Sequence, residues 1–265
     1  IRFARHFLSI QSFYMKILNW KRYVISKNFH DNLLKEYSSI KKDKKIRFTD
    51  KINNINVKDL CIKFEDKEII KNFNLNISCP FFIKISGDNG SGKTSLSRSL
   101  LGLIEIDNGK ITYNNKDVNM IEKTDLSKKV TILDKNPLII KGSLLDNIAL
   151  GLEKEMYDKK KILSLVSQLN LNNIFNDKNI DLENIEENGK NLSQGQQQKI
   201  SVIRSMINEF EIIIIDEGTS NIDEKDEKKI IDYLFNSYNN NEKSTIFISH
   251  KSKYDEIFKQ KINLN

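Results

Sequence analysis

The sequence has 265 residues, of which 38% are hydrophobic, and it carries a formal net charge of +7. A chain of this length can bury a large core, and its two cysteines, Cys61 and Cys79, are too few for a disulfide-stabilised scaffold and lie in no metal-ligand spacing. No run of about 18 apolar residues is present, so no segment is expected to span a membrane unaided.

The positive charge is concentrated near the N-terminus. Residues 1–48 contain twelve basic and three acidic residues, which gives +9 and leaves −2 for the rest of a chain whose total is +7. The larger part of the chain therefore lacks the basic surface that is typical of nucleic-acid-binding domains, and we expect no nucleic-acid partner.

Residues 1–45 are expected to be helical, because apolar residues recur there at spacings of three and four. The residues of this stripe are Phe3, Phe7, Ile10, Tyr14 and Ile17. The pattern predicts either an amphipathic helix packed on the rest of the chain or the cytoplasmic end of a transmembrane helix, where Lys and Arg are enriched. Since the chain begins with Ile1 and not Met, we expect it to be part of a longer protein. We assign residues 1–50 to a basic helical segment with a linker, and 51–265 to a separate domain.

Short strands are predicted from about Val57 onward. The segments Val57–Phe64 and Ile69–Ile77 predict an antiparallel pair. The apolar run Phe81–Ile85 predicts a buried strand, and helix-compatible residues follow from Ser95 to Gly102.

Between that strand and that helix lies Gly87–Thr94, which reads G-x-x-x-x-G-K-T and is typical of a phosphate-binding loop. Its glycines let successive N–H groups point at phosphate oxygens, and the start of the helix adds its positive dipole end. Lys93 is placed to contact the β- and γ-phosphates, and Thr94 to offer its hydroxyl to Mg²⁺. The residues expected to contact the nucleotide here are Gly87, Asp88, Asn89, Gly90, Ser91, Gly92, Lys93, Thr94 and Ser95.

Strands and helices alternate through the remainder of the chain. We expect a turn at Asp107–Gly109 followed by a strand, another strand at Val130–Leu133, a helical insertion over residues 138–182 and a helix at Leu192–Ile207. This alternation predicts an α/β domain with a parallel sheet.

The run Ile212–Ile215 is short, wholly apolar and β-branched, which predicts a central parallel strand covered on both faces. It ends in Asp216 and Glu217, at the end of the strand where α/β sheets bind ligands. Asp216 is expected to hold Mg²⁺ through its water shell, and Glu217 to orient the attacking water and accept its proton.

The segment Leu192–Gln196 reads L-S-Q-G-Q and precedes the helix that leads into this strand. With it, the sequence resembles the nucleotide-binding domain of an ABC transporter over roughly residues 55–265. The resemblance includes the phosphate loop (Walker A), this signature, Walker B at Ile212–Asp216, a D-loop at Ser220–Asp223 and a switch histidine, His250. It implies a P-loop NTPase core with a mostly parallel sheet, an antiparallel β subdomain and a helical subdomain at about residues 136–200.

The resemblance also implies how the site is used. ATP and Mg²⁺ would be the cofactors, with Glu217 and His250 catalytic and Thr94 and Asp216 at the metal. Two such domains would dimerise head to tail, so that the signature residues Ser193, Gly195 and Gln196 act on ATP held by the partner. Asp223 would also contact nucleotide. Phe64 would stack on adenine, although a buried core Phe remains the alternative. The absence of an N-K-x-D motif favours ATP over strict GTP use.

Two further segments resemble those of exporters. Gly142–Ile148 is similar to the exporter segment G-T-I-x-x-N-I, and Glu187–Gly189 to the E-x-G motif that meets the transmembrane domain. The resemblance therefore implies a single-cassette exporter module, the C-terminal part of a half-transporter, joined to a transmembrane domain at the cytoplasmic face of the cell membrane.

Two positions depart from the family pattern. Gln194 stands where the signature usually carries Gly. Lys135 stands where a Gln usually helps to hold Mg²⁺, and a fixed cation there disfavours the metal unless the lysine contacts phosphate or points away.

Two other functions remain open from the sequence. One is a soluble ABC-type ATPase acting on DNA or ribosomes, although the chain has neither a long coiled coil after the phosphate loop nor a second cassette. The other is a degenerate, ATP-binding regulatory half of a heterodimer, which only Lys135 favours.

Overall fold

The computed structural model describes residues 45–64, 67–152, 157–172, 180–181, 183–249 and 254–264. Apart from Lys45, all of these belong to one unit, residues 46–265. The predicted basic helix and the predicted switch histidine His250 lie outside the described residues. Among the described residues, no helix is both long and apolar enough to cross a membrane.

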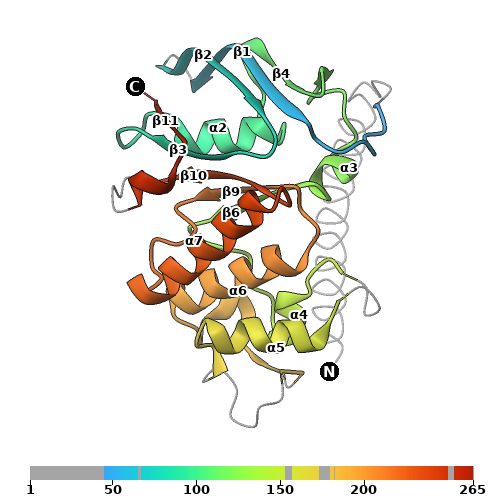
Figure 1. The fold of residues 1–265 in the computed structure, drawn as a ribbon, viewed down its shortest axis with the longest axis vertical. Coiled ribbons are helices and arrows are strands. Elements are labelled where there is room, and N and C mark those ends of the chain that lie inside the picture. The colour runs from blue at the N-terminus through green and yellow to red at the C-terminus, as the bar shows by residue number, and fades with distance from the viewer. Residues whose placement is uncertain are drawn as a thin grey trace, which may run out of the picture. The chain divides into compact units, whose positions relative to one another are not determined.

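A five-stranded parallel sheet in the order β11-β3-β10-β9-β6 forms the centre of the unit (Figure 1). Its strands are β3 (Phe82–Ser86), β6 (Val130–Asp134), β9 (Ile212–Asp216), β10 (Ser244–Ile248) and β11 (Gln260–Asn263). The strand β9 lies between β10 and β6 and is buried throughout, which confirms the predicted central strand.

Each side of β9 packs into a different hydrophobic core. Ile213 and Ile215 join one cluster with residues of the large helices, whereas Ile212 and Ile214 join a second cluster on the opposite face of the sheet. Burying an isoleucine side chain contributes about 1.5–3 kcal/mol, so β9 is one of the best-anchored strands of the domain.

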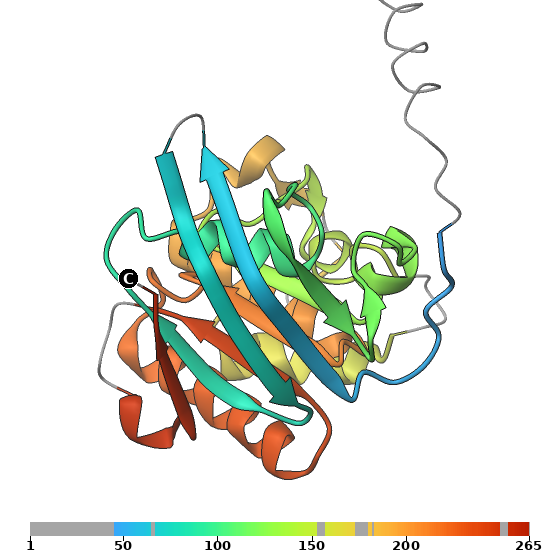
Figure 2. The same ribbon diagram turned by 90° about the horizontal axis from the view of Figure 1, so that it is seen from above.

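An antiparallel sheet in the order β2-β1-β4-β5 covers the second core (Figure 2). Its strands are β1 (Asn54–Phe64), β2 (Lys67–Ser78), β4 (Asn108–Tyr113) and β5 (Lys116–Asp117). The predicted antiparallel pair is confirmed. The turn predicted at Asp107–Gly109 is wrong, because β4 already starts at Asn108. The pairing of β1 with β4 is irregular there, and Gly109 lies so close to β1 that a Cβ atom would be 2.4 Å from the carbonyl oxygen of Asp59.

Helices cover both faces of the parallel sheet. They are α2 (Lys93–Leu100), α3 (Lys123–Ser127), α4 (Leu144–Ile148), α5 (Lys159–Gln168), α6 (Gln194–Ile207) and α7 (Glu224–Asn239). The segment predicted as a helical insertion does contain α4 and α5, but a short pair of strands, β7 (Gly142–Ser143) and β8 (Glu183–Ile185), accompanies them.

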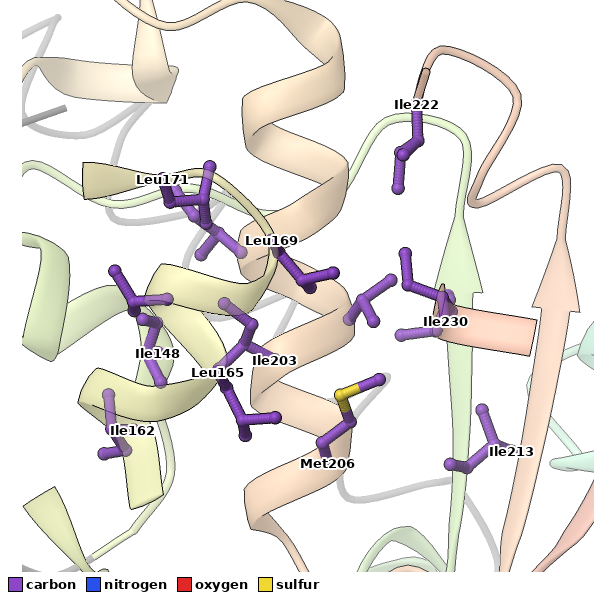
Figure 3. Close-up of a cluster of buried hydrophobic side chains, with 14 of the residues drawn as sticks. Ile148, Ile162, Leu165, Leu169, Leu171, Ile203, Met206, Ile213, Ile222 and Ile230 are labelled. Carbon is purple, nitrogen blue, oxygen red and sulfur yellow. The ribbon is translucent and has the colours of Figure 1, made fainter. Parts of the chain in front are cut away.

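The core below the sheet joins these helices to the loop after β9. Figure 3 shows Ile162 and Leu165 of α5 and Ile203 and Met206 of α6 in one apolar cluster. Ile222 also belongs to this cluster, so the predicted D-loop is anchored by an apolar side chain.

Candidate active site

The phosphate-type loop runs from the end of β3 to the start of α2. A Cβ atom at Gly87 would lie 2.3 Å from the carbonyl oxygen of Leu264, and one at Gly92 would lie 2.6 Å from Cγ2 of Ile69. Gly92 also has φ +89°, a left-handed conformation that favours glycine. Both positions therefore require glycine, and the loop is fixed between β11 and β2.

Lys93 opens α2 and its ammonium lies inside this loop. Its Nζ donates to the carbonyl oxygens of Gly87 at 2.9 Å and Asp88 at 2.6 Å. Burial lowers the pKa of Lys93, and the carboxylates of Glu217, Asp216 and Asp88 offset part of that effect. The Lys93 ammonium is thus held inside the loop, where it could contact a bound phosphate group.

The donors around Lys93 also suit an anion. The first turn of α2 has no side-chain cap among the described residues, so its N–H groups remain available. The Oγ atom of Ser91 is buried and has no hydrogen-bond partner among those residues. A buried hydroxyl without a partner is costly, and phosphate oxygens would satisfy it.

A cavity of about 260 Å³ lies beside the loop, at the carboxyl ends of β6 and β9. It is lined by Thr94, Arg98, Asp134, Lys135, Asn136, Asp216 and Glu217. The structure therefore brings together the loop threonine and the two acids that the sequence analysis placed at the reaction centre.

Asp216 is buried and oriented by α2, because the Ser97 hydroxyl donates to its Oδ2 at 3.0 Å. Asp134 is its register partner on β6. Burial raises the pKa of Asp134, the Asp216 carboxylate raises it further, and Arg98 lowers it. Sequence reasoning missed Ser97 and Asp134; the signal for Ser97 was its position one helical turn beyond Lys93.

Glu217 has φ +54°, and the Nζ atom of Lys135 lies 3.6 Å from its Oε2. The Lys135 side chain is 55% exposed and that of Glu217 is 32% exposed. Lys135 therefore lies beside the acid that the sequence analysis expects to act as the base. An ion pair this open to solvent is weak, about 0–1 kcal/mol.

Phe64 ends β1 and is 68% exposed. This excludes the alternative of a buried core phenylalanine. An exposed ring at a strand end is available for stacking on a planar group.

Comparison with known proteins decides the family. The sequence profile described as ABC transporter matches residues 70–220, more than half of the chain. The chain belongs to the ABC transporter family. The matched region runs from before the Walker A loop to the start of the D-loop.

Curated relatives of this ABC domain include two ATP-binding proteins of bacteria. This chain is 31% identical over 183 residues to the multidrug resistance-like ATP-binding protein MdlB of Buchnera aphidicola subsp. Schizaphis graminum. The matched region covers 68% of this chain and 31% of MdlB. The lactococcin-G-processing and transport ATP-binding protein LagD of Lactococcus lactis is 31% identical over 69% of this chain and 26% of its own. The chain thus spans about a third or less of the length of these relatives.

A solved structure of a bacterial Atm1-family ABC exporter with ATP bound has the same fold. It superposes with a TM-score of 0.75 at 17% identity, over 90% of this chain and 43% of that chain. The likeness confirms the expected ABC fold, with its parallel sheet, antiparallel sheet and helices.

The ABC signature lies at the N-terminus of α6. Ser193 caps the helix: its Oγ accepts from the Gln196 N–H at 3.2 Å, and the Gln196 Oε1 accepts from the Ser193 N–H at 2.8 Å. A Cβ atom at Gly195 would lie 2.6 Å from the carbonyl oxygen of Asn221, so the signature and the D-loop are in close contact. None of the three signature residues lines the cavity at Asp216.

In the D-loop, Asp223 caps α7 and pairs with Lys199 of α6 at 2.9 Å. The hydrogen bond from Lys199 lowers the pKa of Asp223. Burial raises the pKa of Asp226, but hydrogen bonds from Lys199, Lys229 and Asn170 outweigh it and hold the value at about 2. Asp223, whose carboxylate is predicted to contact nucleotide, therefore also connects α7 to α6, the helix that begins at the signature.

The ABC ATPase domain family binds ATP, and this loop fits a triphosphate through its glycines, its Ser91 hydroxyl and its lysine. Among the described residues, no group of three or more His, Cys, Asp or Glu side chains is arranged to hold a metal ion. The residues present would therefore hold Mg²⁺ only together with phosphate oxygens and water, which is how Mg²⁺ is usually bound.

Proposed function

We propose that this chain is the ATP-binding and ATP-hydrolysing module of an ABC exporter. The observation that carries the proposal is that Thr94 of the phosphate loop and the acids Asp216 and Glu217 line one cavity, while the adjoining Lys93 is held inside the loop. The direct test is Mg²⁺-dependent release of phosphate from ATP by the purified chain. A chain that binds ATP but releases no phosphate would support the regulatory alternative, which the position of Lys135 beside Glu217 favours.

Each part of the site has a proposed task. The loop N–H groups, the Ser91 hydroxyl and Lys93 bind the β- and γ-phosphates, and Phe64 stacks on adenine. Thr94 and Asp216 would hold Mg²⁺, which when bound would supply positive charge beside the phosphates. Ser97 keeps the Asp216 carboxylate oriented. Glu217 orients the attacking water and takes its proton. His250, outside the described residues, is the proposed second catalytic group.

We also propose that the site is completed by a second ABC ATPase domain. Ser193, Gly195 and Gln196 line no part of the cavity in their own chain, although the signature is the family's defining motif. In a head-to-tail dimer they contact the γ-phosphate held by the partner, with Asp223 at the same interface. Closing on ATP and opening after hydrolysis would then move the attached transmembrane domains.

The membrane assignment rests on the relatives and on the exporter-type segments. Ser143 of Gly142–Ile148 forms a capping box with Asp146 at the start of α4, and Asn147 is fully buried, so this segment is built into the helical part. We propose residues 1–50 as the link to a transmembrane domain, residues 51–265 as the ATPase domain with its helical subdomain at about 136–200, and the cytoplasmic face of the cell membrane as the location.

Dimerisation is expected to depend on ATP. With Glu217→Gln, which should retain ATP, the chain is expected to sediment as a monomer without nucleotide and as a dimer with Mg²⁺-ATP. The same variant carrying Ser193→Arg as well should stay monomeric, because the signature face would be blocked. Sedimentation that does not change with ATP would point to an obligate heterodimer or refute the head-to-tail arrangement.

Lys135→Gln is expected to lower the Mg²⁺ concentration that gives half-maximal ATPase activity. The change should be about fivefold. Two unit charges about 4 Å apart in water interact by roughly 1 kcal/mol, and removing a repulsion of that size between Lys135 and Mg²⁺ shifts the binding equilibrium of the metal by that factor. The matched control is Lys141→Gln, since Lys141 is an exposed lysine of the same connecting segment that lines a different cavity. Superimposable magnesium titrations of Lys135→Gln and the unmodified chain would show that Lys135 does not act on the metal.

A further inference from the structure

Gln198, in the second turn of α6, is fully buried, and its side-chain amide bonds to two separate segments. Its Nε2 donates to the Lys135 carbonyl oxygen at 2.9 Å and to the Ser220 Oγ at 3.4 Å. Its Oε1 accepts from the Asn221 N–H at 2.9 Å. One side chain therefore joins the signature helix, the segment after β6 and the D-loop after β9.

Both of these segments flank Glu217. Lys135 lines the cavity of about 260 Å³ described above, and Ser220 lines a second cavity of about 160 Å³. Glu217 lines both cavities, so it lies between the two segments that Gln198 holds.

The backbone of Glu217 depends on its surroundings. Its φ of +54° is in the left-handed region, which an L-residue with a long side chain adopts only when neighbouring structure imposes it. Its N–H donates to the Ile248 carbonyl at 3.2 Å, and its carbonyl accepts from the Ser220 N–H at 3.0 Å. The second of these bonds comes from the segment that Gln198 holds.

We propose that Gln198 is a positioning residue for Glu217. Gln198 fixes the two segments on either side of that acid in one arrangement. This inference rests on the proposed role of Glu217 as the base. Gln198 contacts neither nucleotide nor reacting atoms in this proposal. It acts through the backbone of Lys135 and through the D-loop.

The chemistry of the site selects glutamine. A primary amide offers an acceptor and two donors on one rigid plane, which matches two oxygen acceptors and one N–H donor. Methionine fills a similar volume but makes none of these bonds. Asparagine keeps the amide but is one methylene shorter, so it cannot reach both segments from the same helix position.

The test compares Gln198→Met and Gln198→Asn with Gln197→Met in the full chain. Gln197 is the same residue type at the preceding position of α6, and its Nε2 donates to the carbonyls of Gly189 at 3.0 Å and Leu192 at 3.3 Å, away from the cavity. We expect kcat to fall about tenfold to a hundredfold in both Gln198 variants, because small displacements of a catalytic group have effects of this size. ATP affinity, by calorimetry, and the thermal midpoint should change no more than in Gln197→Met.

A kcat equal to that of Gln197→Met would overturn the inference. So would a loss of ATP affinity that parallels the loss of kcat, since that is the result of a purely structural role. If Gln198→Met does not fold, Gln198→Asn carries the comparison. Glu217→Gln is measured alongside. If this variant still hydrolyses ATP at the full rate, the proposed role of Glu217 as the base is wrong. If it is inactive while the Gln198 variants are fully active, only the positioning role of Gln198 is refuted.

Discussion

Replacing Lys93 with alanine is expected to abolish ATP hydrolysis and to weaken ATP binding by about tenfold to a hundredfold. A hydrogen bond to a charged group contributes about 1.5–3 kcal/mol, and Lys93 would make such contacts at the densest negative charge of the nucleotide. In the structure its ammonium is already held within the loop by the Gly87 and Asp88 carbonyls, so little reorganisation separates it from the phosphates.

Isothermal calorimetry with ATP and a phosphate-release assay measure the two effects of Lys93→Ala. The control is Lys110→Ala, because Lys110 is exposed on β4 and its ion pair with Asp117 is long, at 3.7 Å. We expect the control to bind and hydrolyse ATP like the unmodified chain. Unchanged ATP affinity in Lys93→Ala would contradict the phosphate-loop assignment and with it the whole proposed function.

Replacing Glu217 with glutamine is expected to lower the turnover of ATP by about 10²–10⁴-fold while ATP binding is retained. General base catalysis typically contributes a factor of this size. The amide keeps the shape of the side chain, but it cannot take a proton from water. The expected signature is thus a loss of kcat with little change in nucleotide affinity.

Single-turnover phosphate release and ATP affinity are the two measurements for Glu217→Gln. Glu105→Gln is the matched control, since Glu105 is exposed in the loop between α2 and β4. A rate near that of the unmodified chain would remove Glu217 from the role of base. A rate already negligible in the unmodified chain would instead favour a regulatory half, with Lys135 neutralising the acid.

Much of the candidate phosphate site was predictable because it is local. Gly87–Thr94 is one continuous motif between a buried strand and a helix, and its conformation follows from its own glycines and from its flanks. The central strand was equally clear, since four consecutive isoleucines admit few other environments. Asp216 and Glu217 were candidates because they directly follow these four isoleucines.

The contacts between distant segments were not predictable. Lys135 and Glu217 lie on opposite sides of the helical region in the sequence, so the sequence placed Lys135 at a metal-ligand position but did not predict its ion pair with Glu217. Ser97 and Gln198 look like ordinary polar residues of helices, and their roles appear only when tertiary packing fixes where their side chains point. The start of β4 was missed because an irregular stretch of β1 places a turn-like glycine within a strand.

The alternation of isoleucines along β9 has a consequence for the lifetime of the site. Local fluctuations open segments that few contacts hold, whereas a strand shared by two cores separates from its neighbours only when both cores come apart. Asp216, at the end of this strand, is therefore protected by the global cooperativity of the domain. If the chain hydrolyses ATP as proposed, the Asp216 carboxylate is expected to keep the same position from one cycle to the next.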